Sequence, residues 1–192
     1  MRRTLRLLAA LLVAGCTSYG ATNSPVTDQN GVEVPDLLGR WRIADFVEGP
    51  ACLVIAPLVQ RTYHASLDEC DSLPKSSWRA EFTRLGGELF AVAQTEITDT
   101  AVNLGEEVLA LYSFYRVRTR NDSLFVGELN AFSLRTYLVA HPAEIPFVLL
   151  EGNGPDVLLT ATPEQLAEFL AAHARDTTFW ASDSAPDGWW AR

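Results

Sequence analysis

The chain has 192 residues, three of them cysteines, and a formal net charge of −9 at pH 7. An acidic chain repels nucleic acid and anionic lipid headgroups. The densest group of basic residues stands on alternate positions and forms no cluster: Arg116, Arg118 and Arg120. We therefore predict no nucleic-acid partner.

Residues 1–15 have the layout of an export signal peptide. Arginines at positions 2, 3 and 6 precede an apolar run from Leu7 to Gly15, which is far shorter than the roughly 20 residues that span a bilayer. The end of this run, residues 12–16 (LVAGC), resembles the lipobox of bacterial lipoproteins. The alternative is an ordinary signal peptide with a chance cysteine.

The lipobox resemblance implies a lipid-anchored protein of the cell envelope. In that family a peptidase cuts before the cysteine, here Cys16, and acyl chains such as palmitate are attached to it. Two or more acyl chains hold a protein on a membrane surface without a transmembrane helix. Thr17 follows, and a residue other than Asp at this position implies the outer membrane if the cell is Gram-negative.

The rest of the chain divides into a linker and a folded part. Residues 16–35 are predicted to be a flexible tether, because Thr, Ser, Gly, Asn, Pro and Asp dominate them. Residues 36–192 are predicted to form a single β-rich globular domain, since that length can bury one apolar core. Without the three arginines of the signal peptide, the net charge becomes about −12.

The predicted domain opens on Leu38, Gly39, Arg40 and Trp41, and this Gly-x-Trp is similar to the first strand of lipocalin-like barrels. The resemblance implies an antiparallel barrel with Trp41 at its closed end and a small apolar ligand at its open end. The later Thr-Asp-x-x-Tyr motif of that family has no convincing counterpart in this chain. An ordinary core tryptophan is the alternative for Trp41. The ligand-contacting residues expected from a barrel are Trp41, Tyr63, Phe82 and Tyr115.

Cys52 and Cys70 form an even pair once Cys16 is set aside, and an oxidising compartment favours a disulfide between them. The chain must then reverse direction between them, and Pro57 is the expected place. A loop of this size is worth about 3 kcal/mol in the chain-entropy model. Two buried thiols are the alternative, and a metal site is not expected because no histidine stands at ligand spacing.

Apolar residues at every second position predict a mainly β (α+β) fold, as an antiparallel meander or a lipocalin-like barrel. Gly86 and Gly87 predict a hairpin with a primed turn, and Asn121 with Asp122 predicts a second hairpin. Strands are expected at 53–55, 63–67, 78–82, 88–92, 109–117, 124–126, 147–150 and 157–159.

Two helices are expected in the second half of the chain. Thr162, Pro163 and Gln165 form a capping-box start for a C-terminal amphipathic helix, whose apolar stripe runs from Leu166 to His173. Mixed apolar spacing is compatible with a short helix at 131–140. The tryptophans of the tail either pack back on the domain or form an exposed patch for a partner: Trp180, Trp189 and Trp190.

No catalytic motif is present, so the sequence predicts neither an enzyme nor a cofactor. The three histidines are far apart in sequence: His64, His141 and His173. We expect His64 at the surface and His173 at a helix end, where a cation meets the helix dipole favourably. Other carboxylates lack calcium-loop spacing and are interpreted as solvated charge: Asp68, Glu69, Asp71, Glu106 and Glu107.

Two classes of function remain. The first is a membrane-anchored envelope lipoprotein that acts as a structural or protein-interaction module, through its acidic surface or its Trp-bearing tail. The alternative is a lipocalin-like binder of small apolar ligands. The second hypothesis requires an internal cavity of a few hundred Å³.

Overall fold

The computed structural model describes residues 19–43, 51–68, 70, 76–95, 111–150, 156–180 and 189–191. The predicted signal peptide, Cys16 and four of the loop carboxylates (69, 71, 106 and 107) lie outside these ranges. In chain order the strands are β1 (Tyr19–Ala21), β2 (Gly39–Ile43), β3 (Ala51–Val59), β4 (Thr62–Asp68), β5 (Ser76–Leu85), β6 (Glu88–Thr95), β7 (Tyr112–Arg120), β8 (Ser123–Glu128), β9 (Phe147–Leu149), β10 (Val157–Leu159) and β11 (Trp189–Ala191). The helices are the 3-10 helix η1 (Pro35–Leu37), α3 (Ala131–Ala140) and α4 (Pro163–Ala172).

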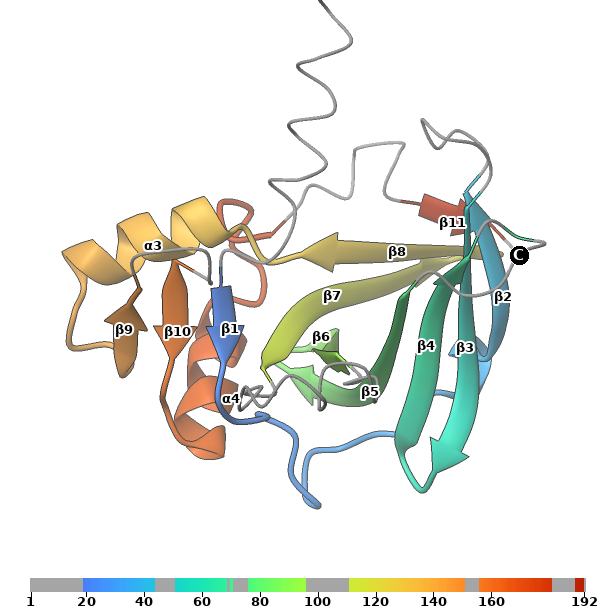
Figure 1. Cartoon of the computed structure of the whole chain (residues 1–192), viewed down its shortest axis with the longest axis horizontal. Helices are drawn as coiled ribbons and strands as arrows, with labels where there is room; N and C mark the ends of the chain where they lie inside the picture. The colour runs from blue at the N-terminus through green and yellow to red at the C-terminus, as the bar shows by residue number, and fades with distance from the viewer. Residues whose placement is uncertain are drawn as a thin grey trace, which may run out of the picture.

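The strands form one large, mostly antiparallel sheet, which confirms the predicted fold class (Figure 1). Strands β2 to β8 pair in sequence order as a meander. The three-residue strand β11 pairs with β8 on one side and with β2 on the other. The sheet is not closed into a barrel, so the meander is the predicted architecture that the structure shows, and the prediction of a lipocalin-like barrel was wrong.

Both predicted hairpins are present. Gly86 and Gly87 have φ angles of 58° and 83° and connect Leu85 to its partner Glu88, as a primed turn requires. Asn121, with φ of 52°, begins the turn between β7 and β8. The reversal between the two cysteines occurs at residues 60–61 rather than at Pro57, which pairs with Tyr63 inside the β3–β4 ladder.

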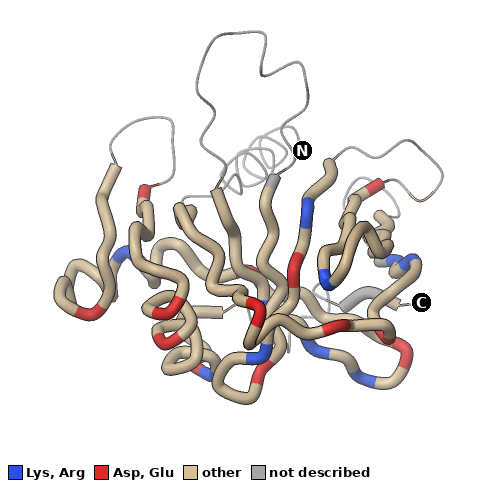
Figure 2. Tube along the Cα trace, turned by 90° about the horizontal axis from the view of Figure 1, so that it is seen from below, with Lys and Arg blue, Asp and Glu red and all other residues tan. Residues whose placement is uncertain are grey.

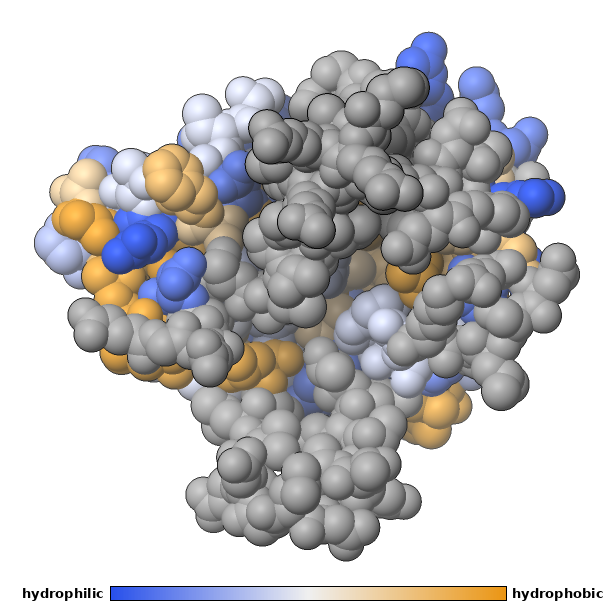
Figure 3. All heavy atoms as spheres, turned by 45° about the horizontal axis from the view of Figure 1, so that its top comes forward, coloured by the Kyte–Doolittle hydropathy of each residue, from blue (hydrophilic) through white to orange (hydrophobic). Residues whose placement is uncertain are grey.

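Charged residues of both signs are interspersed along the described chain in the view of Figure 2. Large exposed apolar side chains concentrate instead on α3 and around β9, with two more at the β3–β4 turn: Phe132, Val139, Val148, Leu149, Leu150, Leu58 and Val59. Hydrophobic atoms are visible over the end of the molecule that carries α3 and β9 (Figure 3). Neither of the two described α-helices has the length and hydropathy of a membrane span.

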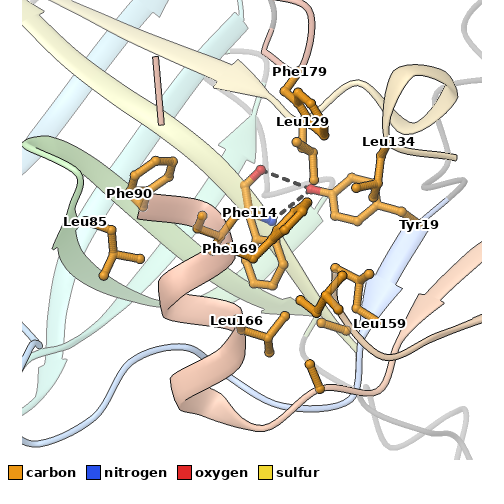
Figure 4. Packing of buried hydrophobic residues seen from close by; sticks show 14 of the residues in the cluster. Tyr19, Leu85, Phe90, Phe114, Leu129, Leu134, Leu159, Leu166, Phe169 and Phe179 are labelled. Carbon is orange, nitrogen blue, oxygen red and sulfur yellow. Dashed lines mark hydrogen bonds between the residues drawn. The ribbon is translucent and has the colours of Figure 1, made fainter. Parts of the chain in front are cut away.

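The sheet lies between two apolar clusters, because successive side chains of a strand point to opposite faces. The inner cluster consists of Val34, Leu37, Trp41, Ile55, Tyr63, Ala80, Phe82, Val117 and Leu124. The outer cluster includes Tyr19, Leu85, Phe90, Val92, Phe114, Leu134, Leu138, Leu166, Phe169, Phe179 and Trp180 (Figure 4). Both faces of β6 are therefore apolar, which explains the unbroken apolar run of residues 89–93 in this strand.

Two helices contribute to the outer cluster. In α4, the capping box of Thr162 and Gln165 is present, and Leu166, Phe169 and Leu170 are buried as predicted. The expected helix at 131–140 is α3, whose N-cap Asn130 accepts a hydrogen bond from the backbone of Ser133. It buries Leu134 and Leu138 against the outer cluster.

Residues 19–35 are not the flexible tether that their composition predicted. Tyr19 is 1% exposed, and β1 pairs with β10 and, at Ala21, with Tyr112 of β7. The Tyr19 hydroxyl donates to the Phe114 carbonyl (3.0 Å) and accepts from the Phe114 amide (2.8 Å). Strand β8 pairs with β7 only as far as Tyr115, so Tyr19 satisfies backbone groups that β8 leaves without a partner.

The C-terminal tail packs back on the fold. Trp180 is 2% exposed, contacts the ring of Phe90, and donates from Nε1 to the His173 carbonyl at 2.9 Å. Strand β11 continues the sheet beside β8. For Trp180 the packed alternative is the observed one, whereas the side chains of Trp189 and Trp190 lie outside the described part of the structure.

Candidate functional site

The inner face of the sheet lines a partly open pocket of about 260 Å³. Its wall is formed by side chains from β3 to β8 together with Leu37 of η1. Four of the inward positions are alanines, and their small side chains leave the space unfilled: Ala65, Ala80, Ala91 and Ala93. Only three lining residues carry a polar side-chain atom: Trp78, Tyr115 and Glu128.

The four residues expected to contact a ligand divide into two pairs. Phe82 and Tyr115 line the pocket. Tyr63 packs edge-on against Phe82 with 5.2 Å between ring centroids, and its hydroxyl accepts a hydrogen bond from the Val34 amide. Trp41 is 2% exposed and donates to the Leu37 carbonyl at 2.9 Å. Trp41 and Tyr63 therefore belong to the packed inner cluster beside η1 rather than to the pocket wall.

Glu128 is the acidic residue of the pocket wall, and it pairs with Tyr115 across β7 and β8. The Glu128 side chain remains accessible to solvent. The apolar wall around it nevertheless removes part of its hydration, and this partial desolvation raises the pKa of Glu128. Burial, and then the nearby Glu128 charge, raise the pKa of Tyr115 to about 12, against a lowering hydrogen bond with Ser113. The pocket thus offers one carboxyl group and one neutral hydroxyl among hydrocarbon surfaces.

Sequence reasoning missed Glu128, although a signal for it exists. Leu124, Val126 and Glu128 alternate along β8, so an inward-facing strand that begins with two apolar residues must place Glu128 on the same side. The alanines of β4, β5 and β6 are likewise visible as inward positions once the strand register is known. An acidic residue that follows inward-facing apolar residues at alternate strand positions therefore indicates a polar group in the wall of a pocket.

Cys52 and Cys70 are at disulfide distance, with their Cα atoms 4.8 Å apart. The buried Asp68 accepts a hydrogen bond from the Cys70 amide at 2.6 Å and lies 3.7 Å from the Arg40 guanidinium, which also donates to the Cys70 carbonyl. The cysteine sulfurs and the Asp68 carboxylate are close enough for a metal ion. Bonded sulfurs are not thiolate ligands, so we assign the group a structural role.

Folding brings two of the three histidines together on the outer layer. His141 and His173 both contact the ring of Tyr137, at 4.3 Å and 4.9 Å between centroids. Glu144 accepts from the Tyr137 hydroxyl and lies 2.9 Å from His173 Nε2. Burial alone would raise the pKa of Glu144, but the hydrogen bonds from Tyr137 and His173 outweigh it and lower that pKa.

This polar cluster joins the segment after α3 to the end of α4, so His173 combines the expected helix-end position with a contact to another segment. His64 is separate from it, on β4. The cluster lies on the outer layer, whereas the pocket lies on the inner face.

Comparisons with protein-family models, with curated proteins and with solved structures found no significant match, so the pocket is interpreted from its own geometry.

Proposed function

We propose that this protein binds a small, mainly apolar molecule in the inner pocket of its sheet. The observation that carries the proposal is the apolar-walled space of about 260 Å³ inside an otherwise packed cluster. An apolar cavity of about 150 Å³ takes up benzene, so this pocket suits a ligand of roughly ten non-hydrogen atoms. Pockets of this kind bind through apolar contact and are oriented by a few polar groups.

The polar groups of the wall narrow the ligand class. The Glu128 carboxylate accepts hydrogen bonds, and the Tyr115 hydroxyl stays neutral because its pKa is about 12. A ligand that matches both has an apolar body and an N–H, O–H or cationic group at one end. An acidic ligand would be disfavoured, since its charge would meet that of Glu128 without a cation on the pocket wall.

We further propose that binding takes place at the cell envelope, with the protein anchored through an acylated Cys16. The support is the lipobox-like segment 12–16 and the short apolar run before it. Replacing Cys16 with Ser should release the protein into the soluble fraction. Membrane fractionation of this variant together with the wild type tests the anchor independently of the pocket.

The interaction-module hypothesis has less support at Trp180, because this side chain is buried in the core. Trp180 lies in the outer cluster, and β11 is paired on both sides. We therefore propose the inner pocket, rather than the tail, as the binding site of the protein.

The pocket is tested with 1-naphthylamine, a fluorescent apolar amine of suitable size. Ala91→Leu fills the pocket and should weaken binding about tenfold or more. Ala56→Leu is the matched control, because Ala56 alternates with the pocket residue Ile55 and faces away from the pocket. Thermal unfolding verifies that both variants fold. Saturable binding that both substitutions leave unchanged would place the site elsewhere, and no saturable binding by the wild type would refute the proposal.

A further inference from the structure

The described chain starts very close to the proposed lipid anchor. Only Thr17 and Ser18 separate Cys16 from Tyr19. Three residue steps extend over at most about 11 Å. Tyr19 is fixed by its two hydrogen bonds to Phe114 and by the pairing of β1 with β10. An acylated Cys16 is therefore confined to a short distance from the start of β1, and the membrane surface with it.

Helix α3 lies at this point of the fold. Tyr19 is beside Leu134 of α3 in the outer cluster (Figure 4), and α3 runs past the start of β1 (Figure 1). On its outward side α3 exposes Phe132 (78%) and Val139 (57%), seven residues apart and hence on one face. Large apolar side chains exposed on one surface commonly mark a contact with a partner or a membrane.

The same end of the molecule carries further exposed apolar side chains (Figure 1). Val148 and Leu149 of β9, and Leu150 after it, are each more than a third exposed. We call these three residues, together with Phe132 and Val139, the α3–β9 surface. The other described residues of this kind, Leu58 and Val59, lie at the β3–β4 turn, on the opposite side of the molecule (Figure 1).

The charge of α3 also suits a membrane surface. The helix contains no acidic residue and one basic residue, Arg135, within a chain whose net charge is −9. The like-charge repulsion that opposes general adsorption of this acidic chain is therefore weak at α3.

We propose that the anchored protein rests directly on the bilayer, with the α3–β9 surface in the interfacial region. This inference rests on the proposed acylation of Cys16 and is independent of the ligand pocket. The acyl chains provide attachment, and the short link and the α3–β9 surface set the orientation. A second protein bound to the same surface is the competing occupant.

The test uses the full lipidated protein in phosphatidylcholine vesicles that contain spin-labelled phosphatidylcholine. Phe132→Cys and Val59→Cys are each labelled with bimane, and Val59 is a matched control because it is an apolar residue of similar exposure, 68% against 78%. We expect lipid quenching to be several-fold stronger at position 132. Equal quenching at the two positions, in protein that floats with the vesicles, would overturn the proposal and leave the α3–β9 surface to a protein partner.

A second variant tests the short link. A spacer of about ten Gly and Ser residues between Ser18 and Tyr19 should preserve flotation and reduce quenching at position 132, because a flexible spacer frees the domain from the surface. Unchanged quenching would contradict the orienting role of the link. Failure of the wild type to float overturns the anchor and this proposal together, whereas loss of 1-naphthylamine binding concerns the pocket alone.

Discussion

Glu128 combines a polar role in the pocket with a cost to the folded state. Desolvation raises its pKa in the folded protein, so the folded state retains the proton to a higher pH than the unfolded chain. The protein is therefore most stable, with respect to this group, below the ordinary pKa of 4.5. Stability then falls as pH rises from that value through the raised pKa.

We expect Glu128→Gln to remove this fall and to be slightly more stable than the wild type at pH 7. The difference should stay below about 1 kcal/mol, because solvent access to the carboxylate weakens the effect. Urea denaturation between pH 4 and pH 8 measures it. Glu33→Gln, at an exposed position outside the pocket, is the control. The same pH slope in wild type and Glu128→Gln would contradict the desolvation argument.

At the scale of elements, the β5–β6 turn is held against α4. A Cβ atom added at Gly86 would overlap the backbone carbonyl of Ala171 and come within 2.8 Å of the Ala174 Cβ. The same atom at Gly87 would meet only the end of the Arg175 side chain, at 3.0 Å. Both glycines have positive φ angles, so a substitution at either position strains the backbone. Only a substitution at Gly86 would also collide with the end of α4.

Gly86→Ala should therefore destabilise the protein more than Gly87→Ala. Each substitution incurs a strain of about 1–2 kcal/mol from the left-handed backbone, and Gly86→Ala adds an overpacking term of about 1–3 kcal/mol. Thermal unfolding of the two variants gives the difference directly. Equal losses would show that the turn does not bear on α4.

Elements with local signals could be predicted from the sequence. The glycine pair of the first hairpin and the capping box of α4 act through neighbours in the chain, so composition and spacing are enough to recognise them. Strand β1 has no such signal, because it is held by Val157 and Phe114, more than 90 residues away. The pocket also depends on contacts between distant strands. The alanines that leave it unfilled can be recognised as inward-facing only when the strand register is known, so the sequence alone allowed a pocket but did not locate it.

At the scale of the whole molecule, the C-terminal tail completes both layers. Strand β11 covers the edges of β8 and β2, while Phe179 and Trp180 lie in the outer cluster. Truncation after Asp176 would remove β11 together with the core side chains of Phe179 and Trp180. The two contributions can be separated by ending the chain at two different residues.

Ending the chain after Trp180 removes β11 and leaves the facing edges of β8 and β2 without their strand partner. We expect a folded but less stable protein that self-associates, because unpaired strand edges recruit other chains.

Ending the chain after Asp176 also removes Phe179 and Trp180, and each large aromatic side chain lost from a core costs about 3–5 kcal/mol. This shorter chain should not fold, since that loss approaches the whole stability of a typical domain. Thermal unfolding and size-exclusion chromatography of the three proteins test this order, and a chain ending at Trp180 that matches the wild type in both would show that β11 is dispensable.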